Sequence, residues 1–249
     1  MKKSGYIYIA ALLLLSSCTS RMAPVQYSAT ERRMADSLKG FDAKMAATIR
    51  PYRDSMDAEM NQVLVVSDTV LTKQMPESDL GNILSEILLQ KAEKYGKRHV
   101  DVAMINFGGI RLPQLPKGNV TRGQAFELMP FDNLLVLLEL NGDLTQQLFD
   151  RMAGAGGVPL AGARYVISKD KKAINITIQG KSFDPSKKYV FALSDYLANG
   201  GEKLDMLKSV PQIETGVLLR DIFIEGFKDI HARGEHLRSI KDGRVTLQQ

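Results

Sequence analysis

The sequence predicts an α+β fold in which mixed sheets and helices are arranged in layers. Short apolar or alternating runs, typical of strands, occur along most of the chain. Longer stretches with apolar residues three and four positions apart, typical of amphipathic helices, lie between some of these runs. The two kinds of segment do not alternate strictly, which argues against a doubly wound parallel sheet. With 249 residues, 44% of them hydrophobic, the chain can bury a sizeable core.

The first residues resemble a bacterial lipoprotein signal. Lys2 and Lys3 precede an apolar run over residues 6–15, and the sequence Leu-Ser-Ser before Cys18 is similar to a lipobox. Residues 1–17 are therefore the predicted signal peptide, and Cys18 the predicted lipidation site. The apolar run is shorter than the ~20 residues that span a bilayer, so acyl chains would supply the membrane attachment. Since Cys18 is the only cysteine, an internal disulfide is excluded.

Two segments precede the predicted domain. Residues 18–29 form a predicted tether, and residues 30–62 form a predicted N-terminal helical segment. Pro51 is expected to kink or restart this helix. The apolar residues of the helical segment recur at spacings of three and four, and they are Met34, Leu38, Phe41, Met45, Ile49, Tyr52, Met56 and Met60. This stripe would pack either on the following domain or on a partner chain.

Residues 63–249 are predicted to form one domain. Thr121 is a candidate helix cap, and the dipeptide Asn141-Gly142 favours a tight turn. The charged residues 169–172 are expected to form the turn of a hairpin. The predicted strands are 63–67, 69–72, 100–105, 134–140, 165–168, 173–179, 189–193 and 244–247. The predicted helices are 76–96, 121–128, 143–152 and 215–231.

The stretch that follows the predicted strand 100–105 carries the candidate functional residues. Asn106 ends the apolar run, and the paired glycines at 108 and 109 allow a positive φ and a close approach to the main chain. Arg111 is a planar cation that suits a carboxylate, a phosphate or an aromatic face. Taken alone, such a stretch is more often an ordinary turn with a solvated arginine. It matches neither a dinucleotide-binding fingerprint nor a P-loop.

Four motifs, taken together, resemble the C-terminal domain of the 5'-nucleotidase family over about residues 63–230. They are Asn106-Phe-Gly-Gly-Ile-Arg111, Gly118-Asn-Val-Thr-Arg-Gly123, Pro130-Phe-Asp-Asn133 and Tyr196-Leu-Ala-Asn-Gly-Gly-Glu202. In that family this domain binds the nucleoside, and a separate metallophosphatase domain carries two metals and performs the hydrolysis. A helix links the two domains there, so residues 30–62 resemble a remnant of that link.

The resemblance implies a set of substrate-binding residues: Asn106, Arg111, Phe131, Asn133, Tyr196 and Glu202. Phe131 and Tyr196 fall where the family places two aromatics that stack on the base, each worth ~1–3 kcal/mol. Glu202 falls where an aspartate usually accepts hydrogen bonds from the ribose, and Arg111 would face the phosphate. The two asparagines match polar contacts to the nucleoside.

One departure from the family pattern concerns phosphate. The family usually carries a phosphate-gripping arginine just before the glutamate near residue 77, where this chain has Pro76. Lys73 is nearby, but an ammonium does not reproduce the geometry of a guanidinium. We therefore expect recognition of the nucleoside to be better preserved than recognition of the phosphate.

No catalytic residue, metal ligand or cofactor is expected in this chain. His99, His231 and His236 are the only histidines, and none lies in a metal-binding motif of the resembled family. Divalent metals are expected only in a partner catalytic chain. Without Lys2 and Lys3 the formal charge falls from +5 to +3, which is too small to indicate a nucleic-acid partner.

Three functions remain open from the sequence. The first is the nucleoside- or nucleotide-binding domain of a 5'-nucleotidase-type hydrolase, acting in nucleotide catabolism with a separately encoded metallophosphatase chain. The second is a non-catalytic, lipid-anchored nucleoside receptor, and the third is an envelope interaction module. All three place the protein in a bacterial cell envelope, attached to the membrane through Cys18, on either the periplasmic or the surface side.

Overall fold

The computed structural model describes residues 42–249. The predicted signal peptide, the tether, Cys18 and the beginning of the helical segment lie outside these residues. The chain divides into two units, Met1–Thr48 and Ile49–Gln249, and all the sheets belong to the second unit. Within residues 42–249, no helix combines the length and the apolar character needed to cross a bilayer.

Helix α2 (Ala43–Met60) forms much of the predicted helical segment. It runs through Pro51 as one helix, so the expected restart at this proline was wrong. The carboxylate of Asp42 caps it by accepting hydrogen bonds from the backbone N–H groups of Lys44 and Met45. None of its residues is buried, and the apolar side chains at positions 45, 49, 52 and 56 are 50–74% exposed.

The central sheet has five strands in the order β12-β6-β11-β3-β7. Strand β11 pairs antiparallel with β6 and parallel with β3, so the sheet is mixed, as the sequence predicted. The strands in chain order are β3 (Val102–Met104), β6 (Leu134–Leu140), β7 (Leu160–Ala161), β11 (Tyr189–Ser194) and β12 (Gln212–Leu218).

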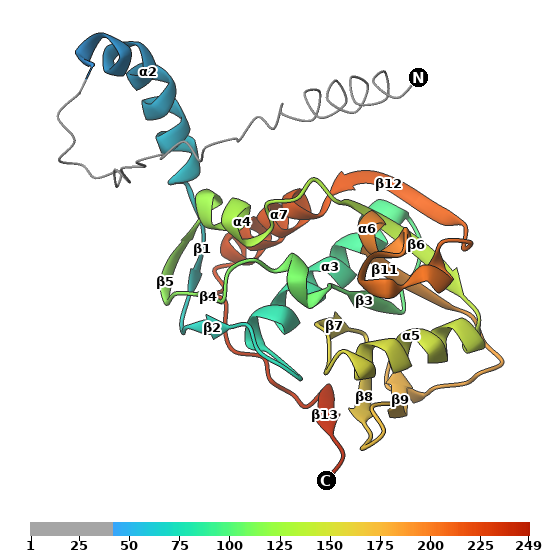
Figure 1. The fold of residues 1–249 in the computed structure, drawn as a ribbon. Helices are drawn as coiled ribbons and strands as arrows, with labels where there is room; N and C mark the ends of the chain where they lie inside the picture. Colours follow the sequence, from blue (N-terminus) through green and yellow to red (C-terminus); the bar gives the residue numbers. More distant parts are fainter. Residues whose placement is uncertain (1–41) are drawn as a thin grey trace, which may run out of the picture. The chain divides into compact units, whose positions relative to one another are not determined.

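Both faces of the central sheet are buried, because alternate side chains of its strands enter two different cores. In β6, Leu135 and Leu137 face one core, and Val136 and Leu138 face the other. The helices around the first core are α3 (Asp79–Gly96), α4 (Arg122–Leu128) and α7 (Leu219–Ala232). Helix α5 (Gly142–Gly154) and a second sheet cover the opposite face (Figure 1). This explains why β6 and β11 are apolar along nearly their whole length.

The second sheet has the order β10-β9-β8-β13 and contains the predicted hairpin. Two further pairs of strands, β1 with β5 and β2 with β4, contribute residues to the first core. The strands are β1 (Val63–Ser67), β2 (Leu71–Thr72), β4 (Gln114–Leu115), β5 (Gly118–Thr121), β8 (Ala163–Ile167), β9 (Ala173–Ile178), β10 (Lys181–Ser182) and β13 (Val245–Leu247).

At the ends of the helices, some predictions from the local sequence are confirmed and others are wrong. Thr121 caps α4 through a capping box with Gln124, as predicted. The expected tight turn at Asn141 was wrong, because its side chain accepts a hydrogen bond from the N–H of Leu144 and caps α5. Residues 215–218, predicted as helix, belong to β12, which is held in the sheet by pairing with β6.

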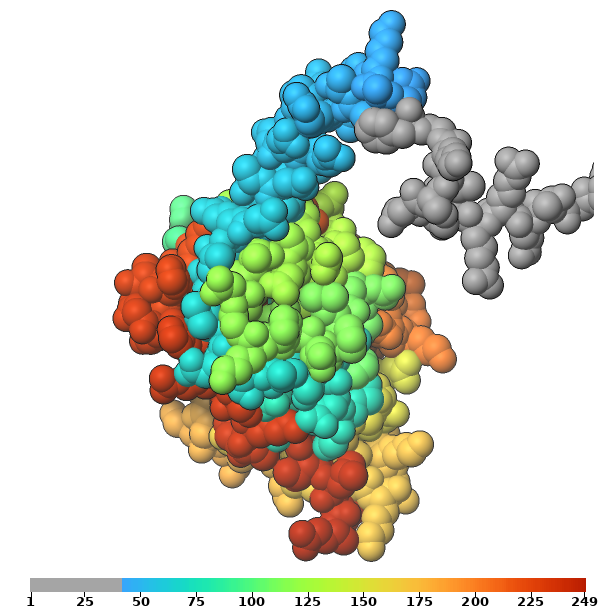
Figure 2. All heavy atoms as spheres, turned by 90° about the vertical axis from the view of Figure 1, so that its left-hand side faces the viewer, coloured from blue at the N-terminus to red at the C-terminus, as the bar shows by residue number. Residues whose placement is uncertain are grey.

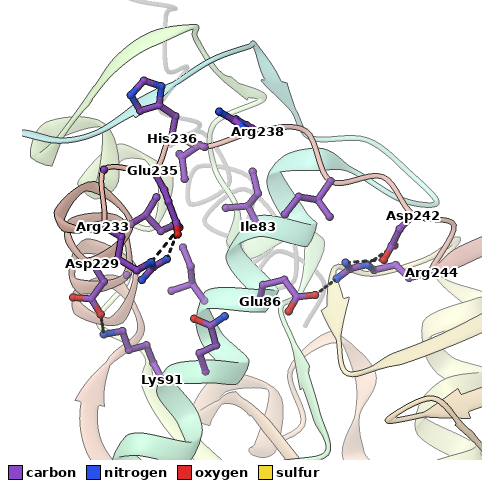
Figure 3. A pocket seen from close by; sticks show the side chains of 17 residues that line it. Ile83, Glu86, Lys91, Asp229, Arg233, Glu235, His236, Arg238, Asp242 and Arg244 are labelled. Atoms are coloured by element: carbon purple, nitrogen blue, oxygen red, sulfur yellow. Dashed lines mark hydrogen bonds and ion pairs between the residues drawn. The ribbon is translucent and has the colours of Figure 1, made fainter.

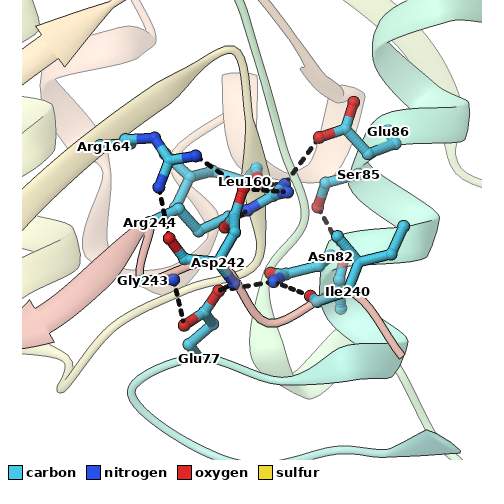
Figure 4. Close-up of polar contacts among 11 residues, drawn as sticks. Glu77, Asn82, Ser85, Glu86, Leu160, Arg164, Ile240, Asp242, Gly243 and Arg244 are labelled. Carbon is cyan, nitrogen blue, oxygen red and sulfur yellow. Dashed lines mark hydrogen bonds and ion pairs between the residues drawn. The ribbon is translucent and has the colours of Figure 1, made fainter. Parts of the chain in front are cut away.

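The C-terminal segment, residues 233–249, contacts parts of the chain that are distant in the sequence. After α7, the N–H of Leu237 donates to the carbonyl of Val66 in β1, and these segments lie side by side (Figure 2). Further on, Arg244 is only 5% exposed and donates to the carboxylate of Glu86 at 2.8 Å and to the carbonyl of Leu160 at 2.9 Å (Figure 4).

Glu77, at the start of α3, belongs to the same network. Its Oε1 accepts hydrogen bonds from Asn82 Nδ2 at 2.7 Å and from the N–H of Asp242 at 3.0 Å (Figure 4). Asn82 Nδ2 also donates to the carbonyl of Ile240. Asn82 therefore holds the C-terminal segment against α3 and has a structural role.

Candidate functional site

Three of the four sequence motifs meet at one end of the central sheet. Strands β3 and β11 are parallel, with Ala103 opposite Ala192, so their carboxyl ends lie together. Strand β6 is antiparallel to β11, so its first residues lie at the same end. Asn106 follows β3, Tyr196 follows β11, and Phe131 precedes β6. In open α/β sheets, ligands bind beyond the carboxyl ends of parallel strands, and β3 and β11 form such a parallel pair here.

A cavity of about 300 Å³ opens at this end of the sheet, near the lower limit for small-molecule sites. Asn106 and Glu202 line it, and the other four predicted site residues lie outside its wall. The remaining lining is mostly apolar and consists of Met75, Met104, Phe107, Gly108, Arg151, Met152, Ala155, Gly157, Val158, Leu197 and Leu204.

Phe131 and Tyr196 expose their rings to solvent. Their exposed fractions are 41% and 46%. The guanidinium of Arg111 lies 5.7 Å from the centroid of the Phe131 ring, within cation–π range. Tyr196 belongs to the short helix α6 (Asp195–Ala198), and its ring rests against Gly201, where a Cβ would be only 2.5 Å from two ring carbons.

Glu202 is held in an unusual backbone conformation. Its φ is 55° and that of Lys203 is 63°, values that cost side-chain-bearing residues ~1–3 kcal/mol. Arg151 from α5 donates through Nε and Nη2 to the carbonyl oxygen of Glu202, at 3.2 and 3.1 Å. Asn106 Nδ2 donates to the Glu202 carboxylate at 3.2 Å. Sequence reasoning missed Arg151, because its position in an amphipathic helix carries no sign of this contact.

The glycines at 108 and 109 do not have the positive φ that the sequence suggested. They form a short 3₁₀ turn, η1 (Phe107–Gly109). The small size of Gly109 still matters, because a Cβ on it would lie 2.7 Å from Asn106 Oδ1, whereas a Cβ on Gly108 would meet no atom closer than 3.4 Å. A close approach, and not a left-handed turn, therefore explains glycine at this position.

Asn133 contacts the helix that carries Tyr196. Its Nδ2 donates to Asp195 Oδ1 at 3.0 Å, and the same oxygen accepts from the N–H of Tyr196 at 2.8 Å. In this structure Asn133 therefore steadies the first turn of α6. A direct contact of Asn133 with a ligand stays a prediction.

Two cations, Lys73 and Arg111, contact backbone carbonyl oxygens of residues 108–110. Lys73 follows β2, and its Nζ donates to the carbonyl oxygen of Ile110 at 2.7 Å. It also lies 4.1 Å from the centroid of the Phe107 ring. Arg111 Nη1 makes a long contact of 3.4 Å with the carbonyl oxygen of Gly108. Burial and the charge of Arg111 lower the pKa of Lys73.

A larger hollow, of about 750 Å³, lies elsewhere, between α3, α7 and the C-terminal segment (Figure 3). Many of its charged side chains neutralise one another. Lys91 pairs with Asp229 at 2.5 Å, and Arg233 pairs with Glu235 at 2.8 Å. This hollow therefore offers a ligand fewer free charges than the sheet end does.

Within residues 42–249, no group of three or more His, Cys, Asp or Glu side chains gathers in a way that could hold a metal ion. His99 contacts Glu93 at 2.7 Å, and His236 contacts Asp68 at 2.6 Å, both as exposed pairs. The location of divalent metals in a partner chain stays a prediction.

The family model of the 5'-nucleotidase C-terminal domain matches residues 59–209, more than half of the chain. The chain belongs to this family. Among curated relatives, it is 29% identical over 189 residues to the cell wall protein Lmo0130 of Listeria monocytogenes, covering 69% of this chain and 24% of that protein. It is 24% identical over 241 residues to the mouse 5'-nucleotidase, covering 83% of this chain and 40% of the mouse enzyme.

A solved structure confirms the fold. The 5'-nucleotidase precursor of Thermus thermophilus superposes with a TM-score of 0.71 at 23% identity, covering 82% of this chain and 43% of that one. The predicted α+β fold with mixed sheets is therefore confirmed. The chain spans less than half the length of each of these three relatives.

Proposed function

We propose that this chain binds the nucleoside part of a nucleotide at the end of its central sheet. The observation that carries the proposal is the register of β3, β11 and β6, which gathers three motifs at one edge. The exposed aromatics Phe131 and Tyr196 and the polar pair Asn106 and Glu202 all belong to these motifs. A purine or pyrimidine is flat and apolar on its faces, so it suits the rings. Ribose hydroxyls suit the Glu202 carboxylate.

The arrangement assigns a role to each group. Phe131 and Tyr196 stack on the base, Glu202 accepts hydrogen bonds from the ribose, and Asn106 orients the Glu202 carboxylate. Arg151 keeps the loop around Glu202 in place through the carbonyl contact described above. These residues bind and orient a substrate, and the proposal includes no chemical step at them.

A calorimetric titration with adenosine and uridine tests this assignment. Replacing one stacking ring, as in Phe131→Ala or Tyr196→Ala, should weaken binding about 5- to 150-fold, since stacking on one ring is worth ~1–3 kcal/mol. Tyr196→Phe keeps the ring and should bind like the parent protein. Tyr52→Ala removes a solvent-exposed aromatic of α2 and serves as the control. Unchanged affinity in both alanine variants of the site would reject the proposal.

A second proposal concerns hydrolysis. We propose that a separately encoded metallophosphatase, which would carry the divalent metals, acts with this protein in nucleotide catabolism. The partial coverage supports this, because the mouse 5'-nucleotidase has more than half its length outside the match. Turnover of AMP by such a partner should rise when this protein is added, and equal turnover with and without it would contradict the idea.

The proposed place of action is a bacterial cell envelope, with attachment through a lipid on Cys18. The sequence around Cys18 and the Listeria relative that is named a cell wall protein both support this. Cys18→Ala should move the protein from the membrane fraction to the soluble fraction of cells. If that variant still fractionated with membranes, a lipid on Cys18 would not be the anchor. A lipid-anchored nucleoside receptor, the alternative function, would share this anchor but would leave the partner's turnover unchanged.

A further inference from the structure

Helix α2 presents a row of apolar side chains to solvent, and no residue of this helix is buried. The row has four members, which are 50–74% exposed and are called the α2 stripe below: Met45, Ile49, Tyr52 and Met56. Neither hydrophobic core of residues 42–249 includes them. A contiguous apolar surface of this kind marks a place of contact with another molecule.

The α2 stripe has the spacing of a coiled-coil seam. Its members follow one another at steps of four, three and four residues. These steps keep the side chains on one face of a helix and leave gaps between them, into which the side chains of a second helix fit. The surface whose shape matches the stripe is therefore another amphipathic helix.

The stripe is also complementary to itself when a second copy of α2 runs in the opposite direction. The order of its steps is the same from either end of the helix. Met45 of one copy then lies opposite Met56 of the other, and Ile49 lies opposite Tyr52. Such a pair has two-fold symmetry, the commonest symmetry of protein dimers. The flexible methionine side chains at the two ends can adapt to irregular gaps.

The charges of α2 favour this antiparallel orientation. Along the helix, all the basic residues come before all the acidic ones. The basic residues are Lys44, Arg50 and Arg53, and the acidic residues are Asp54, Asp57 and Glu59. An antiparallel pair places the basic half of one copy beside the acidic half of the other, whereas a parallel pair places like charges side by side. Opposite charges across an interface stabilise it and fix its orientation.

Helix α2 also lacks the packing that normally stabilises a helix. Most helical stability in proteins comes from the burial of one face, which α2 does not have. Pro51 inside the helix removes a backbone hydrogen bond and costs ~3 kcal/mol. The last turn contacts α4 through an ion pair of Glu59 with Arg122 at 3.6 Å, which leaves the stripe uncovered. A second copy of α2 would supply the missing burial.

We propose that α2 is a dimerisation helix, which pairs antiparallel with α2 of a second copy of this chain. The seam has only four layers of side chains, so the interface is small and the dissociation constant is on the order of 10 µM. Below that concentration the chain is a monomer, and unfolding measured there reports on the monomer alone. The inference is independent of the proposed nucleoside site, because none of the proposed site residues lies in α2.

Sedimentation equilibrium of the full chain tests the dimer, with Cys18→Ala in all variants so that no native cysteine takes part. The mass should rise from monomer to dimer with concentration. Ile49→Asp places a charge in the seam and should weaken the dimer at least 10-fold, or ~1.4 kcal/mol. Ala47→Asp, an exposed position on the opposite face of the helix, is the control. A monomer at every concentration, or an unchanged dimer in Ile49→Asp, would overturn the inference.

Disulfide cross-linking tests the orientation. The double variant Met45→Cys/Met56→Cys should form covalent dimers on mild oxidation, because the two positions face each other across the antiparallel pair. Either single variant should stay monomeric, since its two cysteines would be about 16 Å apart along the seam, beyond the reach of a disulfide. Covalent dimers of the single variants would indicate a parallel pair, and a double variant without covalent dimers would indicate no such pair. Either result would overturn the proposal.

Discussion

At the scale of single residues, the candidate site depends on close contacts that only small side chains permit. Gly201 is the clearest example, because a Cβ there would lie 2.5 Å from carbons of the Tyr196 ring and 2.6 Å from the carbonyl oxygen of that residue. Its φ is not positive, so packing alone explains glycine at this position. Any larger residue must displace the ring that we expect to stack on the base.

Gly201→Ala should therefore weaken adenosine binding about 10-fold, a loss that corresponds to ~1.4 kcal/mol. The thermal midpoint should fall as well, since the new Cβ would also overlap the backbone carbonyl oxygen of Tyr196. Gly154→Ala, at the exposed end of α5, has no atom closer than 3.9 Å to the new Cβ and is the control. The two variants are compared by calorimetry, and parent-like binding by Gly201→Ala would show that the ring position is not critical.

The site residues also show what sequence can and cannot predict. Asn106 and Glu202 were predicted from their motifs, and the structure brings them within hydrogen-bond distance although 96 residues separate them. Arg151 was not predicted as a site residue, and Lys73 was not counted among the site residues. Their hydrogen bonds join residues that are 51 and 37 positions apart in the sequence, and these contacts depend on how α5 and β2 pack. Motifs identify residues with chemical roles, but the residues that position them are determined by tertiary packing.

At the scale of secondary-structure elements, tertiary pairing overrode local preference in two places. Residues 215–218 continue the apolar spacing of α7, yet β12 forms there because the edge of β6 offers backbone partners. Asn141-Gly142 has turn-forming chemistry, yet the following residues complete an amphipathic helix and Asn141 becomes its cap. Strands such as β6 and β11, buried on both faces, were predicted correctly because burial dictates their composition.

Helices α3 and α7 are joined by a charged cluster with a predictable pH response. Burial raises the pKa of Glu225, but hydrogen bonds from Lys91, Lys94 and Tyr95 outweigh it and lower the pKa to about 2. A carboxylate with a lowered pKa in the folded state stabilises the fold above its unfolded pKa of about 4.5, and this contribution is lost as the pH falls toward 2.

Glu225→Gln should therefore have a lower unfolding free energy than the parent protein at pH 7. This difference in unfolding free energy should become smaller as the pH is lowered from 4.5 toward 2. Urea unfolding at several pH values measures this gap, and Glu214→Gln, an exposed residue of β12, is the control. A gap that is absent at pH 7, or that does not change with pH, would show that the cluster does not stabilise the α3–α7 contact.

Helix α2 differs from the other long helices because its apolar residues are exposed. Tyr52→Ala should change the unfolding free energy by no more than ~0.5 kcal/mol, as is usual for surface positions. Phe223→Ala, in α7, removes a ring that is 1% exposed and should cost ~3–5 kcal/mol. Denaturant unfolding compares the two variants. A cost above ~1 kcal/mol for Tyr52→Ala would mean that α2 packs against the domain in solution.

At the scale of residues 49–249, one mixed sheet separates two cores and places the candidate site at its end. Strands β6 and β11 contribute to both cores, so the strand ends that carry Phe131 and Tyr196 project from a rigid frame. The hollow between α3 and α7 has the greater volume, but its charges are paired within the chain. The central claim is therefore that the sheet end, and not this hollow, binds the nucleoside.

Nuclear magnetic resonance of the isotope-labelled protein during titration with adenosine tests this claim most directly. We predict that the backbone amide signals of Asn106, Phe131, Tyr196 and Glu202 shift with a common dissociation constant, while those of Glu86, Arg233 and Arg244 stay in place. Shifts confined to the residues of the hollow, with the sheet end unchanged, would contradict the account.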